Sequence, residues 1–147
     1  SKPIAVLPLA NIVYGPSYVS SQSLLSYYGL IPEAVKQITS VNTKKTKKFK
    51  TAFGVFQYRI IPFSAFGKGV VSIGTKSNNF IGATCEKALL DLCYLAHATD
   101  LFSYATESLR IEPEDLVNLD RSSLAELFPY YKSKQFSKRV ENLIKDL

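Results

Sequence analysis

The feature that most constrains the fold is a series of strand-like segments that ends in one strongly helical segment. Residues 37–83 hold β-branched and aromatic stretches separated by turns rich in Gly, Ser and Asn. The next segment, ATCEKALLDLCYLAHATDLF, has apolar residues at helical spacing. This order predicts an α/β (α+β) fold, and a chain of 147 residues favours one domain spanning residues 1–147.

The strand-like region contains segments that can pair locally. QITSVNT is rich in β-branched residues, and KKFKT, the AFG turn and VFQYRII together predict a β-hairpin. Further strands are expected at GVVSIG and NFIGA. We therefore expect a small mixed or antiparallel central sheet of four to six strands from residues 37–83. Side chains alternate between the two faces of a strand, so the returning strand should have one buried and one solvated face. Phe56, Tyr58 and Ile60 should lie on the buried face, and Val55, Gln57 and Arg59 on the solvated face.

The helical segment predicts a central, largely buried helix at residues 85–98. Thr84 can cap this helix, and Glu86 lies where the helix dipole favours a negative charge. Lys87 and Asp91 have the spacing of an i,i+4 pair, which we interpret as a surface ion pair in a narrow solvated strip. On that interpretation, alanine at Glu86 or Asp91 should cost about 0.5 to 1 kcal/mol of stability.

Flanking helices are expected at both ends of the sheet. Ser20 suits an N-cap for a helix over Ser21 to Tyr28, and Gly29 suits the residue after it. The segment IPEAV should start a second short turn or helix because Pro32 prevents continuation of the first. Near the C-terminus, EPEDLVNL, DRSSLAELF and SKQFSKRVENLIKDL each open with a capping residue or proline and show helical spacing.

Charge is distributed unevenly along the chain. Residues 1–82 contain ten Lys or Arg and one acidic residue, whereas residues 83–147 contain eight against eleven, and the total is +6. This asymmetry indicates a basic face for a polyanion such as DNA or RNA. The candidate nucleic-acid-binding residues are Lys44, Lys45, Lys47, Lys48 and Lys50. The other interpretation is a solvated strand edge that resists edge-to-edge aggregation, and both stay open here.

Other functional classes find little support in the sequence. No apolar run approaches the roughly 20 residues of a membrane helix and no secretory signal is recognisable, so we expect a cytoplasmic protein without a membrane partner. Cys85 and Cys93 would lie about 12 Å apart on one helix, too far for a disulfide. With His97 they fall short of a four-ligand zinc set, which only an added Asp or Glu could complete. Glu86 and Asp91 would lie about 140° apart around the helix, so they could not chelate one ion together. We expect no catalytic residues, metal or cofactor.

Three stretches together resemble a known family. They are GPSYVSSQSLLSYYGLIPEAV, ITSVNTKKTKKFKTAFGVFQYRII and ATCEKALLDLCYL. In this order and spacing, over about residues 14 to 97, they resemble the C-terminal antitoxin domain of the AbiEi family, from type IV toxin-antitoxin systems of abortive infection. Cys85 stands where the family pattern has proline in the helix-opening motif. The C-terminal helices carry no diagnostic match.

The resemblance implies a function and partners. AbiEi proteins are bacterial transcriptional regulators that join a DNA-binding winged helix to this domain, so we expect a winged helix upstream, as the missing initiator methionine also suggests. Such proteins repress their own operon and counteract a nucleotidyltransferase-type toxin without forming a stable complex with it. The resemblance therefore implies an antitoxin domain that is not an enzyme. The alternatives are a protein-interaction or oligomerisation module and a catalytically inactive nuclease-like domain.

Overall fold

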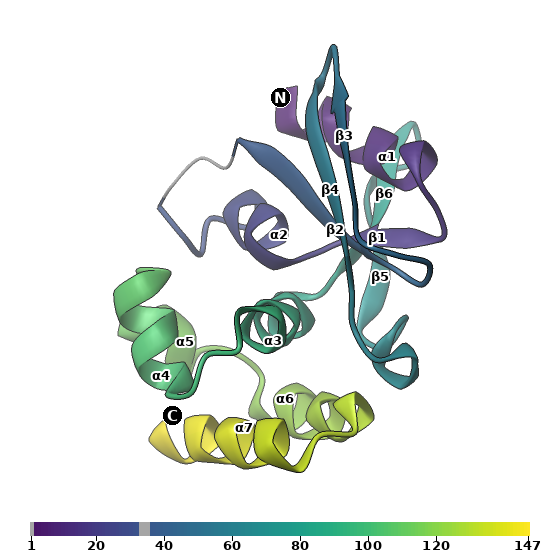
Figure 1. The fold of residues 1–147 in the computed structure, drawn as a ribbon. Helices are drawn as coiled ribbons and strands as arrows, with labels where there is room; N and C mark the ends of the chain where they lie inside the picture. Colours follow the sequence, from purple (N-terminus) through teal and green to yellow (C-terminus); the bar gives the residue numbers. More distant parts are fainter. Residues whose placement is uncertain (1, 33–35) are drawn as a thin grey trace.

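The fold joins one sheet to a group of helices through a central helix. The computed structural model describes the backbone of residues 2–32 and 36–147, and the side chains of residues 6–32 and 36–147. Figure 1 shows the sheet in the upper half, helix α3 (Cys85–Ala96) near the centre, and the C-terminal helices to the left of it and below it. The expected α+β class is confirmed.

The sheet is mixed and has the strand order β3-β4-β2-β1-β6-β5. Parallel pairing joins β2 to β4 and β1 to β6, while the remaining neighbours are antiparallel. The strand bounds are β1 Ser17–Val19, β2 Gln37–Asn42, β3 Lys47–Thr51, β4 Gly54–Ile60, β5 Val70–Thr75 and β6 Asn78–Ala83. The lysine-rich β3 and the uncharged β5 are therefore the two edge strands.

The predicted hairpin is confirmed, but the limits of the sheet are not. Strand β3 pairs with β4 as expected, and the two further strands, β5 and β6, pair with each other. The sheet is not confined to residues 37–83, because β1 lies in its centre between β2 and β6. A strand of three residues has little pattern of its own. Its pairing is determined by β2 and β6, which follow much later in the chain.

Alternation along β4 holds for part of the strand. Phe56 and Tyr58 are buried as expected, whereas Ile60 is 39% exposed and the following Ile61 is buried. The strand ends at Ile60, so the two-residue period does not extend beyond it. The prediction that Ile60 shares the buried face is therefore wrong.

The helices pack on both sides of α3. α2 contacts α3 on the side of the sheet, and α6 contacts it on the other side. α4 continues into a π-helical turn at Tyr104–Ser108, and 3-10 turns occupy Phe63–Ala65 and Phe128–Tyr131. The other bounds are α1 Lys2–Val13, α2 Ser21–Tyr27, α4 Leu101–Ser103, α5 Pro113–Val117, α6 Arg121–Leu127 and α7 Lys134–Asp146.

Helix boundaries follow the predicted signals closely. α2 ends one residue earlier than expected, with Gly29 at a φ of +77° after it. Thr84 caps α3 through its side chain, and His97 ends it in the left-handed conformation. The second turn expected at IPEAV falls largely on residues 33–35, outside the described residues. α1 was not predicted, because Pro8 lies inside it and it has no polar face.

Candidate functional site

Two groups of polar side chains are candidates for function. The first is the lysine patch, formed by Lys44, Lys45, Lys47, Lys48 and Lys50, which surrounds the start of β3. The second, here called the Asp91 cluster, consists of Tyr18, Ser20, Lys87, Asp91 and Tyr131. The sequence pointed to the first group as a site and gave the two charged members of the second a surface role.

Buried Asn42 at the end of β2 fixes the loop that carries two of the patch lysines. Its Oδ1 accepts hydrogen bonds from the backbone N–H groups of Lys44 (2.7 Å) and Lys45 (3.1 Å). Its Nδ2 donates to the carbonyl oxygens of Lys45 (3.0 Å) and Arg59 (3.4 Å). An Asn that binds its own following backbone stabilises a turn. The loop therefore has a defined conformation, with both lysine side chains exposed.

Strand alternation divides the other three lysines between the two sides of β3. Lys48 and Lys50 are exposed on one side of β3, and Lys47 is half-buried on the side of Phe49. The ammonium nitrogen of Lys47 lies 5.7 Å from the centre of the Phe49 ring. That of Lys44 lies 5.5 Å from the Tyr14 ring. These two lysines thus rest on aromatic rings, while Lys48 and Lys50 have no such contact with the described residues.

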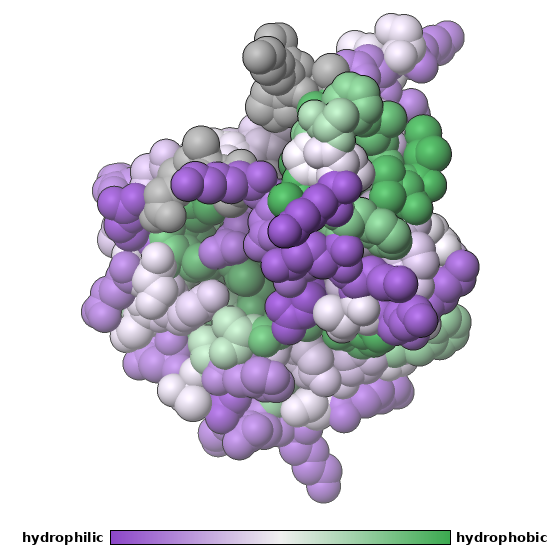
Figure 2. All heavy atoms as spheres, turned by 45° about the horizontal axis from the view of Figure 1, so that its top comes forward, coloured by the Kyte–Doolittle hydropathy of each residue, from purple (hydrophilic) through white to green (hydrophobic). Residues whose placement is uncertain are grey.

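The lysine patch lacks counter-charges. None of its lysines forms an ion pair with a described residue, and residues 36–82 contain no Asp or Glu. Figure 2 shows hydrophilic side chains gathered at the centre of this face, next to a hydrophobic area at its upper right. Uncompensated positive charges so close together raise the local positive potential. Chemically, the patch can bind phosphate groups, with lysines acting as flexible point charges.

The Lys87–Asp91 pair forms as predicted, but its environment corrects the prediction. Nζ of Lys87 lies 3.1 Å from Oδ1 of Asp91, and both side chains are 0% exposed. The pair is therefore buried, and the interpretation as a surface ion pair is wrong. The reason is that β1 and the Phe128–Tyr131 turn cover the strip of α3 that was expected to face water.

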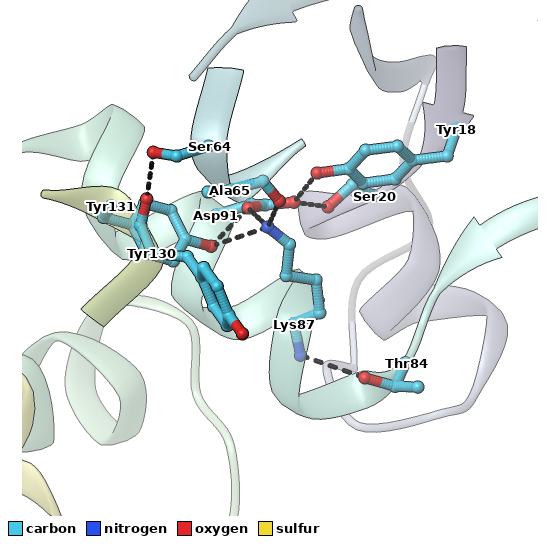
Figure 3. Close-up of polar contacts among 9 residues, drawn as sticks. All are labelled: Tyr18, Ser20, Ser64, Ala65, Thr84, Lys87, Asp91, Tyr130 and Tyr131. Carbon is cyan, nitrogen blue, oxygen red and sulfur yellow. Dashed lines mark hydrogen bonds and ion pairs between the residues drawn. The ribbon is translucent and has the colours of Figure 1, made fainter. Parts of the chain in front are cut away.

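Hydroxyl groups complete the surroundings of Asp91. Its Oδ2 accepts hydrogen bonds from Tyr18 (2.9 Å) and Ser20 (2.7 Å), and its Oδ1 accepts one from Tyr131 (2.5 Å). Figure 3 shows Tyr18 and Ser20 reaching Asp91 from one side and Tyr131 from the other. Ser20 therefore uses its hydroxyl for Asp91, not for the predicted cap of α2.

Lys87 is also fully engaged. Its ammonium group donates to the carbonyl oxygen of Ala65 (2.7 Å) and to the Tyr131 hydroxyl (3.2 Å), in addition to Asp91. The nitrogen lies 4.7 Å from the Tyr131 ring centre, a cation–π distance. Because the ion pair is hydrogen-bonded at every side, the cluster satisfies the condition under which buried charges are tolerated.

Burial shifts the pKa values of this cluster. Desolvation lowers the pKa of Lys87, and the nearby Asp91 opposes that shift. Desolvation raises the pKa of both Tyr18 and Tyr131, and the charge of Asp91 raises them further. Both tyrosines therefore stay protonated and donate to Asp91 at neutral pH. Because Lys87 and Asp91 are fully buried, we assign the cluster a structural role.

The other titratable groups of α3 include Glu86, Cys85 and Cys93. Glu86 accepts a hydrogen bond from the backbone N–H of Asp120 (2.9 Å), so Glu86 and Asp91 face different partners. Cys85 and Cys93 are free thiols, and burial raises their pKa values to about 11 and about 12. Within residues 2–32 and 36–147, no group of three or more His, Cys, Asp or Glu residues is placed to hold a metal ion.

Sequence reasoning missed two residues of this region: one fixes the loop of the lysine patch, and the other lies at the tip of the β3–β4 hairpin. Asn42 was assigned only to a strand, and Phe53 only to a turn. Phe53 is 67% exposed at the tip of the β3–β4 hairpin. The AFG turn offered a signal for Phe53, because a side chain within a two-residue hairpin turn lies beyond the sheet and cannot reach the core. Asn42 had no comparable signal, since its acceptor and donor partners come from three different positions.

Comparison with known proteins does not identify the chain. No family model matches it, and a search of curated proteins finds no significant relative. In the described part of the chain, none of the helices has the length and apolar character needed to cross a membrane.

Proposed function

We propose that this chain is the antitoxin domain of a bacterial, cytoplasmic type IV toxin-antitoxin regulator of the AbiEi kind. It counteracts a nucleotidyltransferase-type toxin and has no catalytic activity of its own. Its lysine patch supports contact with DNA or RNA. The observation that carries the proposal is the resemblance of three stretches in their order and spacing.

The position of these stretches in the fold supports the proposal. The first forms β1 and α2, the second forms β2, β3 and β4, and the third forms most of α3. They are in direct contact, since the backbone N–H of Ser20 donates to the Thr39 carbonyl (3.0 Å) and the Tyr18 hydroxyl donates to Asp91. The resembling residues thus build one continuous unit, which is expected if they derive from a common domain.

The lysine patch favours phosphate contact over base recognition. Its exposed side chains are ammonium groups, which attract phosphates without a fixed geometry, and its carbonyl and amide groups are used internally by Asn42. A surface of this kind adds affinity and salt dependence, whereas sequence is read by groups that contact base edges. The patch is therefore proposed to support binding, not to select an operator.

A growth assay tests the antitoxin role. The chain is co-expressed with the nucleotidyltransferase-like toxin whose gene is expected immediately downstream of its own. We expect restored growth and no stable complex when the two proteins are mixed and separated by gel filtration. Failure of soluble, well-expressed protein to protect the cells would contradict the proposal. A stable complex would contradict the type IV assignment.

A hydrophobic surface favours a second candidate, an oligomerisation or protein-interaction module. At the end of α1, Ile12 is 77% exposed and Val13 is 37% exposed, and Asn11 hydrogen-bonds the backbone of Ile81, itself 40% exposed. Exposed apolar side chains grouped in this way are typical of interaction sites. Sedimentation equilibrium tests this candidate. A monomer at all concentrations would exclude self-association, and an oligomer dissociated by Ile12→Glu would support it.

A further inference from the structure

The tip of the β3–β4 hairpin, which begins two residues after Lys50, presents an exposed aromatic ring. Phe53 is 67% exposed and lies next to Gly54, which pairs with Thr51 where the two strands meet. The other rings of this hairpin are engaged: Phe49 packs against Tyr14 and Tyr58, and Phe56 is buried. Phe53 has no such ring contact among the described residues.

The tip is held in place by its own hydrogen bonds. The Thr51 hydroxyl accepts from the backbone N–H of Phe53 (3.1 Å) and donates to the carbonyl oxygen of Gly54 (2.9 Å). Gly54 has a φ of +124°, a conformation that other residues rarely adopt. The ring is thus carried by a preorganised turn, which reduces the entropy lost when it binds a partner.

The neighbouring charges indicate the chemistry of that partner. Lys48 and Lys50 are exposed on one side of β3, about 7 Å apart by strand geometry, and neither has an acidic neighbour in residues 36–82. A row of lysines followed by a free aromatic ring is the combination with which proteins bind single strands, through phosphates and stacked bases. An apolar protein partner would account for Phe53 but not for the lysines.

We propose that this hairpin tip binds single-stranded nucleic acid, with one unpaired base stacked on Phe53 and the adjoining phosphates at Lys48 and Lys50. The inference rests on the proposed function, in which the lysine patch contacts nucleic acid, and it names the form of nucleic acid bound. A duplex fits less well. Its bases are already stacked on one another, so a ring that enters must first separate a base step, at a cost of about a few kcal/mol.

Binding to short oligonucleotides tests the proposal with the 147-residue chain. The probes are a 20-nucleotide oligo(dT), an oligo(U) of equal length, an abasic strand with the same phosphates, and a duplex. Phe53→Ala should weaken binding of the first two by about 5-fold to 150-fold, the fold-change equivalent to about 1 to 3 kcal/mol for loss of base stacking. Its binding to the abasic strand should match that of the unmodified chain. The oligo(dT) and oligo(U) arms show whether DNA or RNA is preferred.

Phe63→Ala is the matched control. Phe63 is 79% exposed but lies outside the hairpin, in the turn before β5, so its removal should leave all four affinities unchanged. Equal weakening of single-stranded and duplex binding by Phe53→Ala would indicate a wedge in a duplex and overturn the proposal. So would an unchanged affinity for oligo(dT) and oligo(U).

The two proposals fail in different ways. If Lys48→Gln with Lys50→Gln reduces the salt dependence of binding while Phe53→Ala has no effect, the patch binds phosphates and only the stacking inference is wrong. If the unmodified chain binds none of the four probes, nucleic-acid contact itself is wrong, and the stacking inference with it.

Discussion

The lysine patch and Lys87 use the same side chain in opposite ways. The patch lysines form no ion pair with the residues that the structure describes, so their charge is available to another molecule. Lys87 is fully buried and bound to Asp91, Tyr131 and the carbonyl of Ala65. The comparison teaches that a lysine whose charge is uncompensated is available to a partner, whereas a lysine whose ammonium donors have acceptors contributes to the fold.

The two regions should also differ in their effect on stability. Breaking a buried ion pair leaves an uncompensated charge and typically costs about 3 to 5 kcal/mol. Substitution at exposed positions usually changes stability by about 0.5 kcal/mol or less. The Asp91 cluster also connects distant segments, because Tyr18 comes from β1 and Tyr131 from the turn before α7. Substitutions in the Asp91 cluster on α3 should therefore lower the free energy of unfolding more than substitutions in the hairpin.

The largest effect is expected for Asp91→Ala. This change removes the ion pair and leaves Lys87 with only two neutral acceptors, and it takes away the acceptor of three hydroxyl groups. We expect the free energy of unfolding to fall by about 3 to 5 kcal/mol, measured by urea denaturation. This loss of stability is larger than the loss of about 0.5 to 1 kcal/mol that the sequence predicted for Asp91→Ala at a surface position. Glu86→Ala on the same helix is the control, and the smaller value still applies to it.

Lys87→Met tests whether the Asp91 carboxylate is the centre of the cluster. In that variant Asp91 keeps its three hydroxyl donors, so the loss should be smaller than for Asp91→Ala. An equal or larger loss for Lys87→Met would show that the carboxylate is not the centre of the cluster. A loss below about 1 kcal/mol for Asp91→Ala would mean that the pair is not buried in solution.

The next effect is a change in stability at alkaline pH. The pKa of Tyr131 is raised in the folded protein, so above about pH 10 the unfolded chain loses a proton that the folded chain keeps. The stabilisation from this group is therefore complete below pH 10 and is lost as pH rises towards the folded pKa. Tyr131→Phe should make the fall in stability shallower by up to about 1.4 kcal/mol per pH unit.

The pH range of this measurement has to exclude Lys87. Its pKa is lowered by burial, so its contribution changes in the opposite direction and increases stability with pH up to its unfolded value, about 10.4. Denaturant titrations from pH 10.5 to 11.5 therefore lie above that value. Cys85 and Cys93 also have raised pKa values, but both thiols are present in Tyr131→Phe and in the unmodified protein, so the difference between the two slopes reports Tyr131. Parallel slopes for Tyr131→Phe and the unmodified protein would show that the hydroxyl is not held protonated.

Local patterns were sufficient to predict much of the fold. The hairpin turns and the caps at Thr84, Asp120 and Ser133 depend on residues a few positions apart, and all appear in the structure. β1 and the burial of Asp91 could not be predicted in this way. Each depends on contacts with segments more than 15 residues away, which no periodicity within one segment reports.

The candidate site was predictable in composition but not in detail. The run of lysines marks an exposed surface in any fold, because charged side chains without partners are not buried. Which lysines rest on rings was not predictable, since Tyr14 approaches Lys44 only when α1 and the sheet are assembled. The i,i+4 spacing of Lys87 and Asp91 correctly indicated a pair. The spacing alone does not indicate whether other segments cover the pair and bury it.

The smallest effect on stability is expected in the lysine patch. Lys45→Gln, Lys48→Gln and Lys50→Gln are combined. Unlike Lys44 and Lys47, these three lysines make no cation–π contact within the part of the chain that the structure describes. Each change should alter the free energy of unfolding by about 0.5 kcal/mol or less, since each side chain is exposed and unpaired.

The same variant should show a large change in binding. Each lost phosphate contact should flatten the plot of log affinity against log salt by about 0.9 for duplex DNA and about 0.7 for a single strand, so three contacts give nearly three or about two units. Binding across a salt series, with urea denaturation in parallel, measures both properties in one protein. An unchanged slope would mean that the patch is a solvated strand edge, whereas lost stability would mean that these lysines, like Lys87, belong to the fold.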